Sequence, residues 1–251
     1  MAEDSSTRSR VAIVTGGGSG IGRAASLELA RSSYAVVVAD LNAASAHSVA
    51  AEIRAFGEVA SGVGCDVSCE DQWGKVLDQA AELGVLETLV SNAAIYPRMA
   101  FVDTRLDDFD RVMAVNLRGA FLGVSRCLPI IRDGGGGSFV LLTSGSGQIA
   151  AVGNPMQRGF SLYGASKAAL DRWALGIAPE LAPLGVAVNL LCPGAVVLTE
   201  GVVRLHLGEE APSETISADR MAVAIGYLAK SRPPAGTGGR YVATEFGRTW
   251  G

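Results

Sequence analysis

The chain has 251 residues, of which 49% are hydrophobic and 18% charged, with a net charge of −4 and a pI of about 5.3. This composition predicts a folded core rather than disorder, and the acidic balance argues against a nucleic-acid partner. The sequence has no secretory signal and no apolar run of about 18 residues, so we expect no membrane contact and a cytoplasmic location. Four cysteines without a CxxC pair agree with a reducing compartment.

Short β-branched segments alternate along the chain with Ala- and Leu-rich segments of helical periodicity. Strands are expected at 10–16, 34–40, 59–66, 86–94, 136–144, 186–194 and 238–245. Helices are expected at 21–33, 43–57 (closed by Gly57), 68–84 (capped by Ser68), 106–131, 163–185 and 217–230 (capped by Ser217). The alternation predicts an α/β fold, a single Rossmann-like domain over 1–251. Its doubly wound parallel sheet would have about seven strands, with helices on both faces. Residues 1–9 are expected to be disordered, and 199–216 to form a lid over the substrate.

The first predicted strand ends in TGGGSGIG, residues 15–22, directly before a helix. Gly16, Gly20 and Gly22 fit the spacing G-x-x-x-G-x-G, and Ser19 and Ile21 lie between them. Missing Cβ atoms allow backbone N–H groups and a helix N-terminus to approach a pyrophosphate. The loop is therefore a candidate dinucleotide site, with a flexible turn as the alternative.

The second strand ends at Asp40, about 20 residues after the glycines, and Leu41 follows. A carboxylate there can accept hydrogen bonds from both ribose hydroxyls of adenosine and would repel a 2′-phosphate. This favours NAD over NADP. The alternative role for Asp40 is that of a helix N-cap.

The following strand ends also carry small or polar residues that are candidates for cofactor contacts. Asp66 can accept from the adenine amino group while Val67 packs on the ring, or Asp66 can cap the next helix. The small segment with Asn92 and Ala93 can line the ribose, and the turn Pro193–Gly194 can pass close to a nicotinamide.

Tyr163 and Lys167 share one helix face in SLYGASKAAL, residues 161–170. An ammonium about 6 Å from the phenol, at an effective dielectric constant near 20, would stabilise the phenolate by roughly 2–3 kcal/mol. That would bring the tyrosine pKa from about 10 to about 8, as a general acid or base requires. Ser144 can hold a substrate oxygen. Asn116 either bends its helix and holds a water beside Lys167, or makes a polar contact between helices. The alternative for the Tyr–Lys pair is an ordinary surface helix.

The motifs TGGGSGIG, CDV, SNAA, VMAVNLRGAF, GSFVLLTS, YGASKAAL and VNLLCPG resemble those of the short-chain dehydrogenase/reductase family, in the family's order, over residues 10 to about 246. The resemblance implies that Asn116, Ser144, Tyr163 and Lys167 are catalytic. It also implies a tetramer, or a dimer, built on the helices that carry Asn116 and Tyr163.

The chain departs from the family pattern at several positions. Ala94 replaces a usual glycine, and the segment between Ser144 and Tyr163 is long, which makes Ser146 an alternative serine. Leu198 occupies a usual threonine position, so the carboxamide contact falls to Thr199 or to the backbone of Val196. The tail ATEFGRTWG replaces a common D-G-G ending, which puts the usual C-terminal interface in doubt.

These features predict an NAD-dependent oxidoreductase that interconverts a medium-sized secondary alcohol, apolar or cyclic, and its ketone. No metal is expected. A non-catalytic nucleotide-binding regulator and an NADP-dependent ketoreductase are the alternatives. Candidate substrate-lining residues are Ile95, Tyr96, Gln148, Ala150, Val152, Met156, Phe160, Val196, Leu205 and Leu207, with His206 in the lid.

Overall fold

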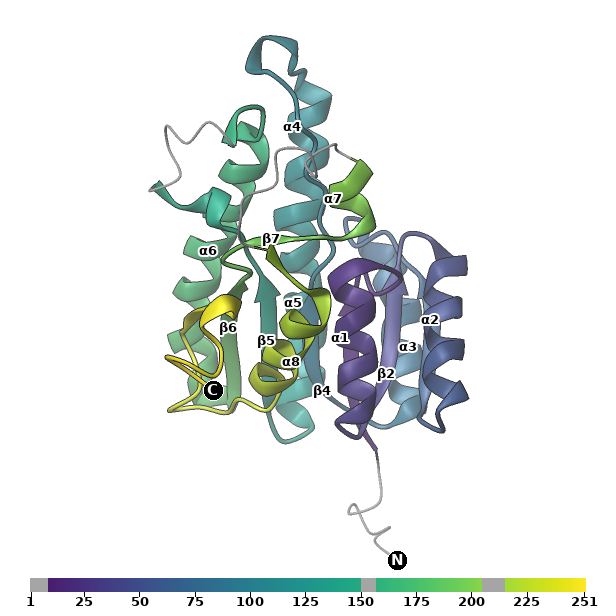
Figure 1. The fold of residues 1–251 in the computed structure, drawn as a ribbon. Helices are drawn as coiled ribbons and strands as arrows, with labels where there is room; N and C mark the ends of the chain where they lie inside the picture. Colours follow the sequence, from purple (N-terminus) through teal and green to yellow (C-terminus); the bar gives the residue numbers. More distant parts are fainter. Residues whose placement is uncertain (1–8, 150–156, 205–214) are drawn as a thin grey trace, which may run out of the picture.

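The computed structural model describes residues 9–149, 157–204 and 215–251. Its centre is a seven-stranded parallel sheet in the order β3-β2-β1-β4-β5-β6-β9, which confirms the predicted doubly wound architecture (Figure 1). The strands are β1 Arg10–Thr15, β2 Tyr34–Asp40, β3 Ala60–Gly64, β4 Val85–Ser91, β5 Gly137–Leu142, β6 Val186–Cys192 and β9 Arg240–Val242. A separate two-stranded pair joins β7 Val196–Val197 to β8 Thr215–Ile216.

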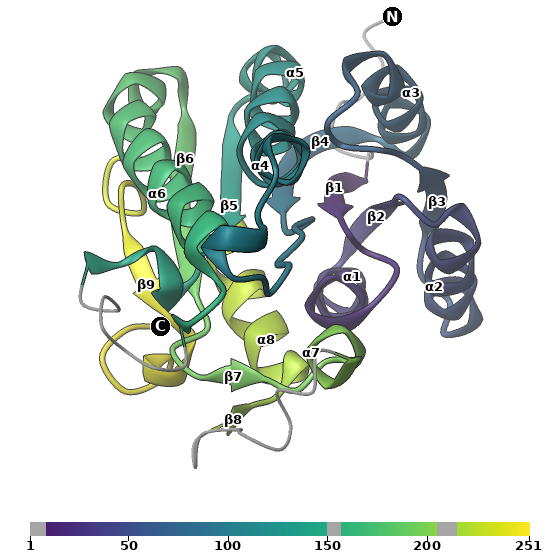
Figure 2. The same cartoon turned by 90° about the horizontal axis from the view of Figure 1, so that it is seen from above.

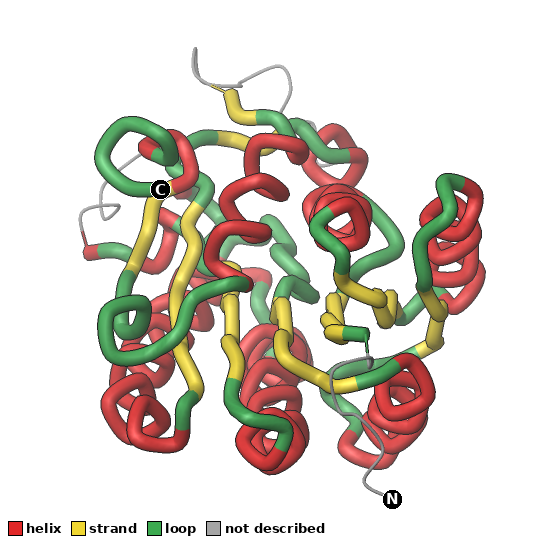
Figure 3. Tube along the Cα trace, turned by 90° about the horizontal axis from the view of Figure 1, so that it is seen from below, coloured by secondary structure: helices red, strands yellow, loops and turns green. Residues whose placement is uncertain are grey.

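Helices cover both faces of the sheet, as Figures 2 and 3 show from opposite ends of the molecule. On one face lie α3 Trp73–Leu83, α4 Leu106–Met113, α5 Gly119–Asp133 and α6 Ser161–Leu181. On the other lie α1 Gly20–Arg31, α2 Ala43–Ala55 and α8 Ala218–Ala229. The short helix α7 Glu200–Arg204 lies beyond the carboxyl ends of the strands, above α1 in Figure 1.

The sheet separates two hydrophobic cores, because successive side chains of each strand point to opposite faces. In β1, Val11 and Ile13 join the core beneath α3, α5 and α6, whereas Ala12 and Val14 join the core beneath α1, α2 and α8. All four are fully buried, which explains why this strand is a continuous apolar segment.

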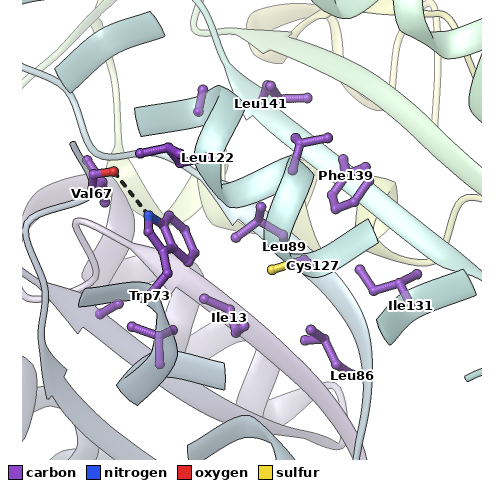
Figure 4. Packing of buried hydrophobic residues seen from close by; sticks show 14 of the residues in the cluster. Ile13, Val67, Trp73, Leu86, Leu89, Leu122, Cys127, Ile131, Phe139 and Leu141 are labelled. Carbon is purple, nitrogen blue, oxygen red and sulfur yellow. Dashed lines mark hydrogen bonds between the residues drawn. The ribbon is translucent and has the colours of Figure 1, made fainter. Parts of the chain in front are cut away.

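Trp73 is the largest fully buried side chain and anchors α3 to the first core (Figure 4). Its indole Nε1 donates to the carbonyl of Val67 at 3.0 Å, so its one polar atom is satisfied. Gly123 of α5 makes room for the ring, since a Cβ there would lie 2.7 Å from the indole.

The helix ends confirm two of the three expected caps. Gly57 follows α2 with a φ of +92°, and Ser217 caps α8 by accepting from the N–H of Arg220. Ser68 is not an N-cap. The chain makes a 3-10 turn over Glu70–Gln72 before α3 begins, and the amide and hydroxyl of Ser68 donate to Asp66 instead.

The predicted helix 106–131 is a continuous helix with a π-helical turn at Ala114–Arg118 between α4 and α5. Within the described residues, Leu106–Asp133 is the one helix long and apolar enough to cross a membrane by length and composition. A buried core helix passes the same test, and the buried residues of α5 pack against the sheet.

Candidate active site

A cleft of about 490 Å³ opens at the carboxyl ends of β1 to β6, where a doubly wound sheet binds ligands. Fifteen residues of the predicted site line it: Gly16, Ser19, Gly20, Ile21, Asp40, Leu41, Asp66, Val67, Asn92, Ala93, Ser144, Tyr163, Lys167, Pro193 and Thr199. Ile95 and Tyr96, expected near the substrate, line it as well. One continuous cleft therefore brings together residues that are up to 183 positions apart in the sequence, from Gly16 to Thr199.

The glycine loop leaves its backbone open to the cleft at the start of α1. Gly16 and Gly20 adopt left-handed conformations, with φ of +62° and +51°. Gly22 has a different role and does not line the cleft, because a Cβ there would lie 2.0 Å from the carbonyl oxygen of Gly16. It lets α1 pack tightly under the loop.

Asn92 holds this loop against the end of β4. Its Nδ2 donates to the carbonyls of Thr15 at 2.9 Å and Gly16 at 3.1 Å, while its own N–H donates to Thr15 Oγ1 at 3.0 Å. The amide side chain is thus committed to the shape of the glycine loop, a role that the strand-end position alone did not reveal.

Asp40 places a carboxylate beside the glycine loop. Its Oδ2 accepts from the N–H of Gly18 and its Oδ1 from the N–H of Asn42, both at 2.9 Å. The N-cap of α2 is Asn42, whose side chain accepts from Ser45, so the alternative role of Asp40 as a helix cap is excluded. The carboxylate lines the cleft beside the glycine loop, and its contact with an adenosine ribose stays a prediction.

Asp66 serves the local turn while it lines the cleft. Its Oδ1 accepts from both the amide (2.9 Å) and the hydroxyl (2.7 Å) of Ser68. This contact closes the turn before α3 but caps no helix, because the N-cap positions there are Cys69 and Gln72. The adenine contact beside Val67 stays a prediction.

Tyr163 and Lys167 of α6 meet Ser144, which follows β5, in the same cleft. The side chain of Ser144 lies close enough to Tyr163 to act on the pKa of its phenol. Lys167 Nζ donates to the carbonyl of Leu142 at 2.7 Å and lies 5.9 Å from the centroid of the Tyr163 ring. Ser146 does not line the cleft; its N–H donates to Ser144 Oγ at 3.2 Å, so the structure favours Ser144 over the alternative serine.

Asn116 lies in the π-helical turn, 2% exposed, and does not line the cleft. Its Oδ1 accepts from the N–H of Ile95, and its Nδ2 donates to the carbonyl of Ile95, both at 2.8 Å. A further bond from Nδ2 reaches Ser166 Oγ of α6 at 3.0 Å. The structure shows the expected departure from regular helix and the polar contact between helices.

The expected acidity of Tyr163 is wrong for the free protein. Burial raises the pKa of Tyr163 to about 12, and the neighbouring Ser144 side chain only partly opposes that rise. Burial also lowers the pKa of Lys167 to about 8, against the attraction of Asp171. Taking a phenolate out of water outweighs the attraction of an ammonium that points to Leu142.

Four of the predicted catalytic and cofactor residues lie outside the cleft lining: Gly22, Asn116, Gly194 and Val196. The expected substrate contacts Gln148 and Phe160 lie outside it as well. Thr199 lies directly over the glycine loop, since a Cβ on Gly20 would approach its Cγ2 to 3.1 Å, which favours Thr199 over Val196 as a cofactor contact. Gly194, with φ +81°, packs on Val242 and Thr244. Of the expected lid, 199–204 and 215–216 are described. Ala150, Val152, Met156, Leu205, His206 and Leu207 lie outside the described residues.

Some cleft residues were not predicted from the sequence, among them Cys65, Arg111, Thr143, Glu200 and Gly201. Gly201 is the clearest case: a Cβ there would lie 2.1 Å from the hydroxyl of Tyr96, whose ring packs edge-on to Tyr163 at 6.0 Å. The position of Cys65 and Thr143 at strand ends was the available signal for those two.

The open backbone at Gly16 and Gly20, the carboxylate of Asp40 and the Tyr163–Ser144–Lys167 group fit a nicotinamide dinucleotide bound along the cleft. The first two groups would hold the pyrophosphate and the adenosine ribose. The third would lie at the nicotinamide end.

Comparison with known proteins agrees with this arrangement. The short chain dehydrogenase family model matches residues 10–209. A short-chain dehydrogenase/reductase of Armillaria gallica is 34% identical over 95% of both chains. A cyclopentanol dehydrogenase of Comamonas testosteroni is 33% identical, over 74% of this chain and 73% of that one. The crystal structure of a short-chain type dehydrogenase/reductase from Mycobacterium marinum, 31% identical, superposes with a TM-score of 0.84 over 94% of both chains. The chain therefore belongs to the short-chain dehydrogenase/reductase family of nicotinamide-dependent oxidoreductases.

Proposed function

We propose that the protein is an NAD-dependent dehydrogenase that interconverts a secondary alcohol and its ketone, with Tyr163 as the general acid and base. The observation that carries this proposal is that the hydroxyls of Tyr163 and Ser144 line one cleft together with Lys167 and the glycine loop. Two convergent hydroxyls are what a carbonyl or alcohol oxygen needs for positioning and proton transfer.

When bound, the cofactor supplies the hydride or accepts it. The chain's own residues manage the oxygen atom and its proton. Ser144 Oγ and the Tyr163 hydroxyl hold the substrate oxygen, and Tyr163 donates the proton to a carbonyl or accepts it from an alcohol. Lys167 is fixed by Leu142 O at 2.7 Å and supplies positive charge behind the phenol.

Asp40 supports NAD rather than NADP. Its carboxylate is held by two backbone N–H groups at the end of β2, so its charge is fixed in place. A 2′-phosphate would bring a second negative charge close to it. An NADP-dependent ketoreductase is the alternative that this residue opposes.

An apolar or cyclic alcohol is the substrate class that the cleft favours. Ile95, Tyr96 and Val115 lie on its walls, and the ring of Phe160 packs on Tyr163 with centroids 6.3 Å apart. The similarity to a cyclopentanol dehydrogenase supports a cyclic secondary alcohol. The substrate would be a small molecule in the cytoplasm.

We also propose a homotetramer, with a dimer as the alternative, assembled on the outer face of α4, α5 and α6. A hollow there is lined by Met113, Leu117, Phe121, Ala169 and Trp173. Phe121 is 52% exposed and packs on Trp173, with ring centroids 5.8 Å apart. An exposed apolar surface of this kind is typical of a subunit interface.

The test measures NADH or NADPH absorbance on addition of a panel of cyclic and open-chain secondary alcohols and ketones. We expect turnover with NAD, and loss of that turnover in Tyr163→Phe with NAD affinity nearly unchanged. Tyr227→Phe, at an exposed position on α8, is the matched control and should retain turnover. Cofactor binding without turnover across the panel would support the remaining alternative, a non-catalytic nucleotide-binding regulator.

A further inference from the structure

A nearly buried ion pair joins α6 to β9 behind the proposed catalytic group. Arg240 Nε donates to Asp171 Oδ2 at 2.8 Å, and the two side chains are only 18% and 15% exposed. Asp171 follows Lys167 by four residues, so both lie on one face of α6. The residues that line the cleft include neither member of the pair, so the pair acts on the cleft only through other residues.

Both members of the pair hold the end of β5, where Ser144 is presented to Tyr163. The Thr143 hydroxyl donates to Asp171 Oδ1, and Arg240 Nη2 donates to the carbonyl of Ser144 at 3.2 Å. Arg240 also lies near the side chain of Cys192 at the end of β6. One ion pair thus connects α6, β5, β6 and β9 at the catalytic end of the sheet.

The Asp171 carboxylate also acts on the buried ammonium of Lys167. The titratable groups around Lys167 are Tyr163 and Asp171 on its own helix and Cys192 on β6, with Arg240 of β9 held against Asp171. Burial lowers the pKa of Lys167 to about 8, and Asp171 is the first opposing influence. Without that carboxylate, the Leu142 carbonyl and Cys192 would remain to offset the cost of a buried ammonium.

We propose that Asp171 and Arg240 are a positioning pair: Arg240 fixes the backbone of Ser144, and Asp171 keeps Lys167 in its ammonium form. The catalytic meaning of this pair rests on the proposed function. Its electrostatic action does not, because it exists in the protein without cofactor or substrate.

The free protein gives a direct readout, since Lys75, Lys167 and Lys230 are the lysines of the chain. NMR of protein labelled with [ε-13C]lysine follows each ammonium separately. In Asp171→Asn we expect the Lys167 midpoint to fall by about one pH unit. In Arg240→Gln the carboxylate loses its neutralising partner, and the midpoint should rise by about half a unit.

Glu87→Gln is the matched control. Glu87 is 19% exposed and pairs with Arg10 at 3.0 Å and Arg232 at 2.7 Å, near the opposite end of the sheet. It should lose a comparable ion pair and leave the Lys167 titration unchanged. Shifts of opposite sign in the two site variants cannot arise from general loosening of the fold. An unshifted midpoint in both variants would overturn the proposal.

Turnover separates this inference from the proposed function. With ketone substrate we expect Asp171→Asn to lower kcat about tenfold with little change in KM, and Arg240→Lys to recover more of the parent's kcat than Arg240→Gln does. If the parent protein showed no turnover but the Lys167 midpoint still shifted in the two variants, the proposed function would be contradicted and the positioning pair supported. If the parent protein showed turnover and both variants kept its kcat and its Lys167 titration, only the positioning pair would be contradicted.

Discussion

Replacement of Gly22 by alanine tests the geometry of the glycine loop most directly. A Cβ at this position would lie 2.0 Å from the carbonyl oxygen of Gly16 and 2.6 Å from Asn92 Nδ2. Atoms in ordinary contact are about 3.5–4.0 Å apart, so the loop would have to move by more than an ångström. That movement would break the 3.1 Å bond from Asn92 to the Gly16 carbonyl.

The cost follows from these contacts. Overpacking in a tightly packed region costs about 1–3 kcal/mol, and loss of one hydrogen bond about 1 kcal/mol. Gly22→Ala should therefore lower the free energy of unfolding by about 2–4 kcal/mol, a large share of the roughly 5–15 kcal/mol typical of a domain. The displaced loop should also weaken NADH binding at least tenfold.

The measurements are urea denaturation and NADH fluorescence titration, with Gly74→Ala as the control. Gly74 lies in α3, and a Cβ there would meet nothing within 4 Å. Its replacement should raise stability by about 0.5–1 kcal/mol through helix propensity and leave NADH binding unchanged. Equal behaviour of the two variants would refute the close packing of α1 under the loop.

Three further predictions concern the charge at β2, the buried lysine and the hollow on the outer face of α4, α5 and α6. Asp40→Asn should raise the affinity for NADPH relative to NADH about tenfold in fluorescence titrations; an unchanged ratio would contradict its role in selection. Between pH 8, near the pKa of Lys167 in the folded protein, and pH 10.5, its ordinary pKa, the unfolded chain binds more protons than the folded protein does. In urea denaturation, the free energy of unfolding of the parent protein should therefore rise with pH across this window, compared with that of Lys167→Met. If the two proteins showed the same dependence of stability on pH, the burial of the Lys167 charge would be contradicted. Leu117→Glu should shift the sedimentation coefficient toward that of a monomer. An unchanged sedimentation coefficient would contradict an interface on this face.

The architecture was predictable because it depends on patterns that the sequence displays. The segment Arg10–Thr15 is buried on both faces, and its continuous apolar character is enough to identify a central parallel strand. The positions of Gly16 and Asp40 at strand ends then follow from topology alone, because parallel strands present their carboxyl ends at one edge. Tyr163 and Lys167 follow from helical spacing.

Contacts between distant segments could not be predicted from the sequence. Asn116 was recognisable as an unusual polar residue in an apolar helix, but its partner Ile95 follows the end of β4. Ser68 precedes an acidic turn, as an N-cap would, yet Asp66 offers its amide and hydroxyl a nearer partner. Arg240 gave no signal at all, since its pairing with Asp171 depends on β9 lying beside β6.

The pKa of Tyr163 shows most clearly what the sequence could not predict, because two large opposing influences decide it. Spacing along a helix gives the attraction of Lys167, roughly 2–3 kcal/mol, but not the depth of burial. Burial acts on both groups in the same sense, since it disfavours phenolate and ammonium alike. With the pKa of Tyr163 near 12 and that of Lys167 near 8, the free protein at neutral pH holds a neutral phenol beside a charged amine. That state is ready to donate a proton to a carbonyl oxygen. Oxidation of an alcohol needs the opposite transfer, so the pKa of Tyr163 must fall once the cleft is filled, and positive charge brought close to the phenol is the physical means of lowering it.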